Sequence, residues 1–462
     1  MTYFMRREQA FFPIYIGLVL IAVIVNFPGR LNPDTVSMMW QAANPTQLNT
    51  WHAPFATFVL SFLNPAFGAP GGGLIIQSIL MMLWPAIIAS EVVRSRGNLS
   101  IRLIYLLGWG AVCAVFIALS GQVNKDILLL AFISSGFFLV TKEYLTPREL
   151  PTIWLLASGA IIVTSIALIR LPNLFILFVP MLVYFNILKR RRAIHVVGRI
   201  LVIFIGTALA YVTIPAILGA KTSHPEIAPI MFDLVGIETV SGDRILERLI
   251  PDVAKLEPKL EQCYSAKQID PFFWGPCAAY GSLASQNIGT VKRAWVPVIL
   301  SHPVAYIRHR LAFAASLLSK DGSGNKIIVP TPPGFDLATN AAPYFSSMPA
   351  EMRTGIQIWR PYLGYVPFGR IAHIAFTSTL GSPLLWVLVA VGGVIWGLKT
   401  RAMSTERWIP FTLGSVGLCN LLMIVVLSGS DDTRYLLPTW MTALGICVFA
   451  VHRLLFYREP SA

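Results

Sequence analysis

The segment AFFPIYIGLVLIAVIVNF, residues 10–27, decides the class of the fold. It carries no charged side chain and approaches the length of a helix that crosses the hydrocarbon core of a membrane. Arg6 and Arg7 precede it, as basic residues precede the apolar part of a signal peptide. Because no small-residue cleavage site precedes the following NFPGR, we expect a retained membrane anchor.

The composition of the whole chain agrees with a membrane protein. Of its 462 residues, 55% are hydrophobic and 13% are charged, whereas about a quarter of the residues of a soluble domain are charged. The polar side chains are therefore too few to cover a soluble globule of this size. The five cysteines show no metal-ligand spacing, and no metal site is expected.

Further apolar segments of similar length recur along the chain and predict about ten transmembrane helices. They lie at residues 10–27, 72–91, 102–119, 126–141, 152–169, 172–188, 197–218, 373–398, 408–428 and 433–451. The predicted fold class is therefore an all-α polytopic membrane protein.

The distribution of Lys and Arg predicts how the chain is oriented. With the N-terminus inside, the short inner segments hold 17 of these residues, including the KRRR run at 189–192. The short outer turns hold one each, namely Arg30, Lys125, Arg170 and Arg434. Both termini are therefore expected in the cytoplasm. The basic residues behind the net charge of +14 are then explained as orientation signals, and no nucleic-acid partner is expected.

The predicted spans divide the chain into three parts. These are an N-terminal transmembrane module (1–218) with a first outer loop at 28–71, a large outer region (219–372) and a C-terminal transmembrane module (373–462). Within the outer region, Cys263 and Cys277 flank a polar loop that contains a Trp. If this loop faces an oxidising compartment, the two cysteines are expected to form a disulfide.

Residues 291–319 of the outer region are apolar on one side and basic on the other. This pattern predicts an amphipathic helix, broken near Pro303, that lies on the outer membrane face or dips into it. The alternative is an eleventh span. It would place His302, Arg308 and Arg310 in lipid, at a high cost in free energy, and would invert all later spans.

Four places on the predicted outer side carry polar groups, and the first is Asp34 in NPDTVSMMWQAA. One interpretation is that Asp34 caps a short helix after Pro33. The other is that a rigidly held carboxylate acts as a general base toward a hydroxyl. The two interpretations are compatible.

The second place is TWHAPF, where Trp51 and His52 stand together. An interfacial aromatic anchor is one interpretation of this pair. In the other, His52 donates a hydrogen bond to a phosphate or orients the acid.

The third place is the start of the predicted span at 126–141, where Asp126 would cap the helix. Its neighbour Lys125 lies against the positive-inside trend and at a helix N-terminus, where a cation is unfavourable. A bound anion would offset both costs. Arg170, at another outer helix end, fits the same idea, because a guanidinium binds phosphate through several donors.

The fourth place is GSDDTRYLLP, residues 429–438, a short outer turn with Asp431, Asp432, Arg434 and Tyr435. An Asp431–Arg434 ion pair, or capping by Asp432, explains these residues in structural terms. Together, however, the four places put carboxylates and cations at one face of the membrane. Such an arrangement suits a lipid-linked phosphate whose head group projects outward.

The order of these motifs resembles that of the GT-C class of membrane glycosyltransferases. The resemblance is to bacterial relatives of the dolichyl-phosphate-mannose protein mannosyltransferases and the lipid A aminoarabinose transferases. It rests on the early acid Asp34, the WHAP step at 51–54, the KD pair at 125–126 and the late D-x-RY-x-x-P at 432–438. It covers the transmembrane segments well and residues 219–372 poorly.

The resemblance implies a GT-C-like fold in the bacterial inner membrane. It also implies transfer of a sugar from a polyprenyl phosphate to an envelope glycan or lipid acceptor at the outer face, with inversion. Asp34 matches the functional acid of the class. The expected donor-phosphate ligands are Lys125, Arg170, Arg434 and Arg310, and the expected site lining is Trp51, His52, Asp126, Asp432 and Tyr435. Residue 35 is Thr where many members carry a second acid. No cofactor is required, and a role for a divalent cation stays open.

Three other functions remain as alternatives. A polysaccharide polymerase or ligase would share the topology and use a diphosphate-linked glycan. A flippase or transporter for a lipid-linked glycan would place polar residues in mid-span and break its helices. The middles of the predicted spans are apolar, and the polar groups lie at their outer ends. A membrane scaffold without enzymatic activity has no positive support in the sequence.

Overall fold

The computed structural model describes residues 2–27, 29–30, 33–68, 70–94, 99–145, 152–169, 193–274, 277–319, 365–399 and 405–456. Throughout these ranges the regular elements are helices, and strand-like pairing is confined to isolated bridges. The predicted all-α class is therefore confirmed for the part of the chain that is described.

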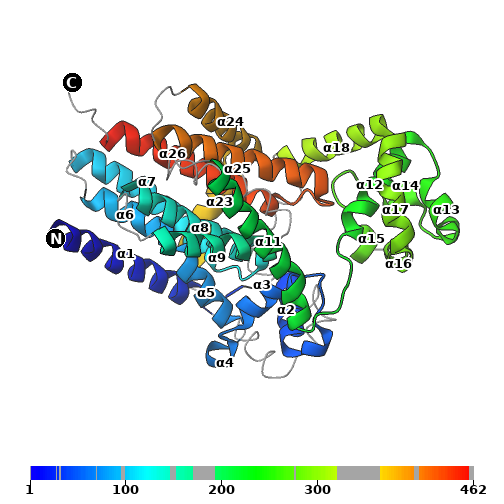
Figure 1. Ribbon diagram of the computed structural model, residues 1–462, viewed down its shortest axis with the longest axis horizontal. Helices are drawn as coiled ribbons and strands as arrows, with labels where there is room; N and C mark the ends of the chain where they lie inside the picture. The colour runs from blue at the N-terminus through cyan, green and yellow to red at the C-terminus, as the bar shows by residue number, and fades with distance from the viewer. Residues whose placement is uncertain are drawn as a thin grey trace.

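Long helices form one bundle (Figure 1). They are α1 (Thr2–Asn26), α5 (Gly71–Met81) followed by α6 (Leu83–Arg94), α7 (Leu99–Ser120), α8 (Lys125–Leu145), α9 (Thr152–Ile169), α11 (Ala193–Ile217), α23 (Tyr365–Thr377), α24 (Pro383–Lys399), α25 (Thr405–Leu427) and α26 (Leu437–Phe456). Short helices α2 (Pro33–Ala43), α3 (Pro54–Ser61) and α4 (Asn64–Phe67) follow α1.

Four apolar stretches in the described ranges are long enough to cross a membrane. They are Gly71–Arg94, Leu99–Ser120, Ile409–Leu427 and Arg434–Arg453. Apolar side chains such as those of Ile104 and Leu107 on α7 point outward and are exposed, as lipid-facing residues would be. The structure is therefore that of an all-α membrane protein. The predicted span at 172–188 lies outside the described residues.

Aromatic rings pack the interior of the bundle. The Trp84 ring of α6 lies 5.5 Å from that of Trp109 and 6.1 Å from that of Phe116, both on α7. Phe116 in turn lies 5.8 Å from Trp440 of α26, measured between ring centroids. Such pairs add to the free energy gained by burial of apolar area, and they hold the N-terminal helices against the C-terminal ones.

The predicted span at 373–398 is interrupted in the structure. The segment 373–398 was expected to be a single helix, but α23 ends at Thr377 and α24 begins at Pro383. Proline suits the first position of a helix and disfavours helical backbone in the residue before it. Gly381 lies in the 3₁₀ turn between the helices, where a Cβ would come within 2.1 Å of the Phe376 carbonyl oxygen. A hydropathy pattern does not detect this break.

A separate group of helices, which we call the distal lobe, comprises residues 227–318. Its elements are α12 (Ile227–Ser241), α13 (Ile245–Leu249), α14 (Leu260–Cys263), α15 (Pro271–Trp274), α16 (Ala278–Gln286), α17 (Ile288–Ser301) and α18 (Pro303–Leu318). The predicted break near Pro303 is confirmed, because α18 starts at that residue. A disulfide joins Cys263 to Cys277, which is the pair that the sequence predicts.

The distal lobe lies at the right end of the bundle in Figure 1, and α18 connects it to the helices of the bundle. α1 begins and α26 ends at the opposite, left end. Phe232, Phe272, Tyr280 and Phe313 are buried in the lobe and form its core. The two described chain ends and the lobe are thus at opposite ends of the bundle.

Backbone pairing joins the exit of α1 to the loop between α7 and α8. The Arg30 amide donates to the Gly121 carbonyl (2.7 Å), and the Val123 amide donates to the Arg30 carbonyl (2.9 Å). Gly29 precedes this bridge with φ of +105°, a conformation that residues with a Cβ rarely adopt. A Cβ at Gly29 would also lie 2.6 Å from the Val123 side chain. Gly29 therefore permits the close approach of the two segments.

We predict that Gly29→Ala lowers stability by about 2 kcal/mol or more, because it adds backbone strain and a clash. Gly108→Ala is the matched control. Gly108 lies within α7 with no atom in the way of a Cβ, so alanine there should be neutral or stabilise by up to about 1 kcal/mol. Thermal unfolding midpoints in detergent measure both variants, and equal midpoints would contradict the role given to Gly29.

Candidate functional site

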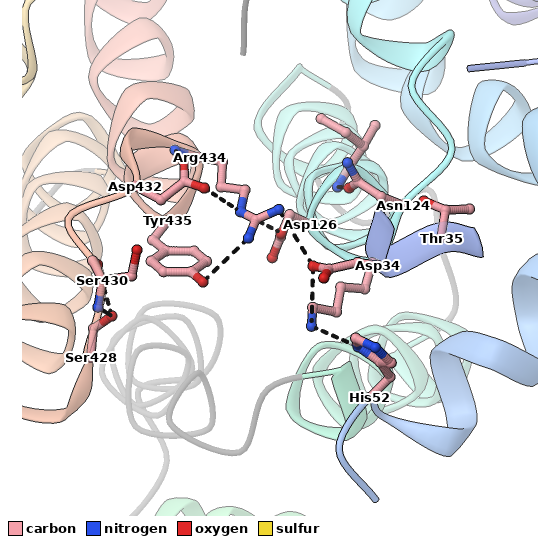
Figure 2. Close-up of polar contacts among 12 residues, drawn as sticks. Asp34, Thr35, His52, Asn124, Asp126, Ser428, Ser430, Asp432, Arg434 and Tyr435 are labelled. Carbon is pink, nitrogen blue, oxygen red and sulfur yellow. Dashed lines mark hydrogen bonds and ion pairs between the residues drawn. The ribbon is translucent and has the colours of Figure 1, made fainter. Parts of the chain in front are cut away.

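Four segments of the chain bring polar and charged side chains together (Figure 2). They are the first turn of α2, the loop that leads into α3, the start of α8 and the turn between α25 and α26. We call the resulting group the polar cluster; it consists of Asp34, His52, Lys125, Asp126, Asp432, Arg434 and Tyr435. The group lies where α8 and α26 begin, at the end of the bundle near the distal lobe (Figure 1).

Local contacts place Asp34 in this cluster. The Thr35 hydroxyl donates to the Val123 carbonyl, which ties the first turn of α2 to the loop that leads into α8. α2 begins at Pro33, so Asp34 lies within the first helical turn and does not occupy the predicted N-cap position. A carboxylate in this turn is favoured by the helix dipole. The same tie brings Asp34 opposite Lys125.

The start of α8 differs from the prediction in its cap. The Asn124 side chain accepts a hydrogen bond from the Ile127 amide (2.8 Å), so Asn124 and not Asp126 caps the helix. Asp126 is buried, and its Oδ2 lies 3.4 Å from Nε of Arg434. Asp126 therefore joins α8 to the turn before α26 through an ion pair.

Arg434 is the centre of the cluster. Its Nε lies 2.6 Å from Oδ2 of Asp432, and one terminal nitrogen lies 3.4 Å from Oδ2 of Asp34. Its guanidinium also lies 5.3 Å from the centre of the Tyr435 ring. Asp432 caps the 3₁₀ turn Thr433–Leu436 by accepting from the Arg434 amide (3.0 Å). Both the backbone and the side chain of Arg434 are thus held by Asp432.

Lys125 is held between an acid and a histidine. Its ammonium lies 3.6 Å from Oδ2 of Asp34 and 3.2 Å from Nδ1 of His52. The ammonium can only donate, so Nδ1 of His52 accepts and the imidazole is neutral. His52 is 5% exposed, and burial lowers its pKa to about 3, with the charge of Lys125 acting in the same direction. His52 therefore orients Lys125 without adding a charge.

The three carboxylates of the cluster differ in their access to solvent. The Asp34 side chain is 28% exposed, whereas those of Asp126 and Asp432 are 4% and 5% exposed. The two buried carboxylates are suited to holding Arg434. Asp34 is the carboxylate that an incoming molecule reaches, and it lies beside both cations.

The other predicted site residues have different places. The Trp51 ring packs against that of Phe273 on α15, 5.6 Å between centroids, so the first loop contacts the distal lobe. Arg170 lies outside the described residues. Asp431 is buried and accepts a hydrogen bond from Ser316 of α18, while the ion-pair partner of Arg434 within the turn is Asp432.

Arg310, which the sequence predicts to bind the donor phosphate, instead lies in a buried ion pair. Its Nε lies 2.7 Å from Asp233, and one terminal nitrogen donates to the Ser428 carbonyl (2.6 Å). The side chain is 6% exposed. The amphipathic pattern placed a cation on a polar helix face, but the opposing acid comes from α12 and could not be inferred from that pattern.

The structure adds Asp270, which the sequence reading did not single out. Burial raises the pKa of the Asp270 carboxyl above its usual value. The charge of Arg434 lowers this pKa, and the charges of Asp34 and Asp431 raise it. Asp270 is therefore within electrostatic reach of the cluster. Its position between the disulfide-forming Cys263 and Cys277 is the one sequence signal that marked this loop.

The polar cluster can bind a polar group and exchange a proton with it. In the part of the chain that the structure describes, no group of three or more His, Cys, Asp or Glu residues is arranged to hold a metal ion. Comparison of the chain with family models, with curated proteins and with solved structures finds no match.

The buried neutral His52 predicts a pH dependence of stability. Because its folded pKa is about 3 and its usual value 6.5, the unfolded chain binds a proton that the folded protein does not bind between these values. Its contribution is complete above pH 6.5 and is lost as the pH falls. Between pH 7 and pH 5 we expect a loss of about 2 kcal/mol.

His52→Gln, measured beside the unchanged protein, tests this prediction. Glutamine does not titrate, so the variant should lose less stability over the same interval, as followed by thermal unfolding in detergent. Other titrating groups are common to both proteins and cancel in the comparison. An identical pH dependence in the two proteins would show that His52 is not buried in its neutral form.

Proposed function

We propose that the protein is a membrane glycosyltransferase that moves a sugar from a polyprenyl-phosphate donor to a glycan or lipid acceptor. The observation that carries this proposal is the position of Asp34, within 3.6 Å of Lys125 and 3.4 Å of Arg434. Such a transfer needs a base for the acceptor hydroxyl beside cations for the departing phosphate. A base and cations occur together in this cluster.

The proposal includes a GT-C-like fold with about ten spans in the bacterial inner membrane. Both termini would lie in the cytoplasm, and the polar cluster would lie at the outer face. The arrangement in Figure 1 supports this orientation, because α1 begins and α26 ends at one end of the bundle while α8 and α26 begin at the other. The basic residues of the short inner segments agree with it.

The proposed step is a single displacement at the anomeric carbon of the donor. The acceptor hydroxyl oxygen forms a bond to this carbon as the bond from the carbon to the phosphate oxygen breaks. The hydroxyl proton passes to the Asp34 carboxylate, and the electron pair of the broken bond leaves with the polyprenyl phosphate. Attack from the side opposite to the phosphate inverts the configuration of the sugar.

The cations contribute most as the phosphate departs. Charge on the leaving phosphate increases toward the transition state, and donors that are already positioned stabilise it without reorganisation. Lys125 and Arg434 are held in place by His52, Asp126 and Asp432. A guanidinium has five N–H donors, so Arg434 can bind a phosphate oxygen while it stays paired with the two buried acids.

A polymerase or ligase that uses a diphosphate-linked glycan would use the same base and cations. A transporter is less well supported, because the charged residues of the cluster belong to the first turns of α2 and α8 and to the turn before α26, and not to the middles of the long helices. Assays with a monophosphate-linked sugar and with a diphosphate-linked glycan distinguish the proposed glycosyltransferase from a polymerase or ligase, because only the preferred donor would be consumed.

We predict that Asp34→Asn lowers the turnover number by about a hundredfold to ten-thousandfold, the usual contribution of a general base. The amide cannot accept the hydroxyl proton but keeps the shape of the side chain. Transfer from a lipid-linked donor in detergent is the measurement. Asp252→Asn is the matched control, since Asp252 is an exposed acid of the distal lobe paired with Lys255. Full activity of the Asp34 variant would remove Asp34 from the mechanism.

We also predict that Lys125→Ala and Arg170→Ala raise the KM for the donor about tenfold or more. A hydrogen bond to a charged group contributes about 1.5–3 kcal/mol. Lys255→Ala, which removes an exposed cation of the distal lobe paired with Asp252, should leave this KM unchanged. Donor dependence that is unaltered in the two site variants would contradict their proposed contact with the phosphate.

A further inference from the structure

The distal lobe contains a buried ion pair. Asp233 of α12 and Arg310 of α18 lie 2.7 Å apart, and their side chains are 0% and 6% exposed. The second oxygen of Asp233 accepts a hydrogen bond from the Trp295 indole of α17 (2.9 Å). The pair therefore holds three helices of the lobe in one arrangement.

Aromatic rings surround the Arg310 guanidinium. It lies 5.2 Å from the ring centre of Phe232, 5.8 Å from that of Phe313 and 6.0 Å from that of Tyr306. Removing two charges from water is costly, and a buried ion pair often gives less stability than apolar residues of the same volume. Such a pair is best attested where it selects one arrangement of the chain.

Arg310 also contacts a residue outside the distal lobe. Arg310 donates to the carbonyl of Ser428 (2.6 Å), at the end of α25. The hydroxyl of Ser316, which lies further along α18, donates to the Asp431 carboxylate. α18 therefore binds both ends of the turn 428–431, which leads directly into Asp432 and Arg434.

The loop closed by the disulfide binds the backbone of the same turn. The Ile269 amide donates to the Gly429 carbonyl (2.7 Å), and the Asp431 amide donates to the Lys267 carbonyl (2.8 Å). A Cβ at Gly429 would lie 2.9 Å from the Ile269 side chain, so the two segments are in close contact. The turn is thus fixed by the lobe on two sides.

We propose that Arg310 is a positioning residue that acts on Arg434 through the turn 428–432, so that the distal lobe sets where the phosphate-binding guanidinium lies. Arg310 itself need not touch the substrate. The inference rests on the proposed function in one respect, that Arg434 binds the donor phosphate. The mechanical part, that Arg310 orders the turn, stands without it.

The test is a double-mutant cycle of Arg310→Lys with Arg434→Lys. Lysine at 310 keeps the charge next to Asp233, but one ammonium cannot replace a guanidinium that spans Asp233 and the Ser428 carbonyl. We expect the single Arg310 variant to raise the KM for the donor about tenfold. In the Arg434→Lys background the same change should have little further effect, because the two residues act in sequence.

Arg308→Lys is the matched control, since Arg308 is exposed on the same helix. It should leave the KM for the donor unchanged in both backgrounds. If the effects of the Arg310 and Arg434 variants multiply independently, Arg310 does not act through Arg434 and the proposal is overturned.

A measurement without substrate separates this inference from the proposed function. Hydrogen–deuterium exchange in detergent should show faster exchange for the amides of residues 429–435 in Arg310→Lys, with no change in α7. Unchanged exchange at 429–435 would overturn the positioning role even if the protein transfers sugar. Failure to transfer sugar from any lipid-linked donor, with the expected exchange, would reject the glycosyltransferase proposal alone.

Ser316→Ala provides a second variant if Arg310→Lys does not fold. It removes the hydroxyl bonded to Asp431 but leaves the buried ion pair intact. The same local increase in exchange is expected at 429–435, of smaller extent. Exchange like that of the unchanged protein would count against control of the turn by α18.

Discussion

The ion pairs of the Arg434 guanidinium are the interaction on which the candidate site depends. They join three segments that the chain keeps far apart, because Asp34 follows α1, Asp126 opens α8 and Asp432 precedes α26. Two of these acids are buried, so the pairs are shielded from the water and salt that weaken ion pairs at a surface. Without Arg434, the two buried acids would each lose an ion-pair partner at the end of an apolar bundle, and loss of one member of a buried ion pair is destabilising.

The surrounding structure serves to hold this group of charges. The bridge between Arg30 and Gln122 brings α2 to the start of α8, and the neutral His52 orients Lys125. The distal lobe fixes the turn before Arg434 through α18 and the disulfide-closed loop. Membrane-spanning helices therefore supply the scaffold, while the lobe and the first loop hold the polar cluster with the precision that the proposed transfer would need.

The sequence predicted those features that depend on local patterns. Apolar runs indicated the all-α membrane class, and Pro303 marked a helix break. Two cysteines on either side of a polar loop predicted the Cys263–Cys277 disulfide. Contacts between residues that are far apart in the chain could not be predicted from local patterns. The Asp233 partner of Arg310 and the electrostatic reach of Asp270 follow from the packing of short lobe helices, which no periodicity reveals.

The most direct test is a structure of the protein with a polyprenyl-phosphate sugar analogue that cannot be transferred. We expect the phosphate within hydrogen-bond distance of Lys125 and Arg434, and the sugar carbon facing the Asp34 carboxylate. Arg434 should remain paired with Asp126 and Asp432. A phosphate bound at another surface, with the polar cluster unchanged and unoccupied, would show that the polar cluster is not the donor site.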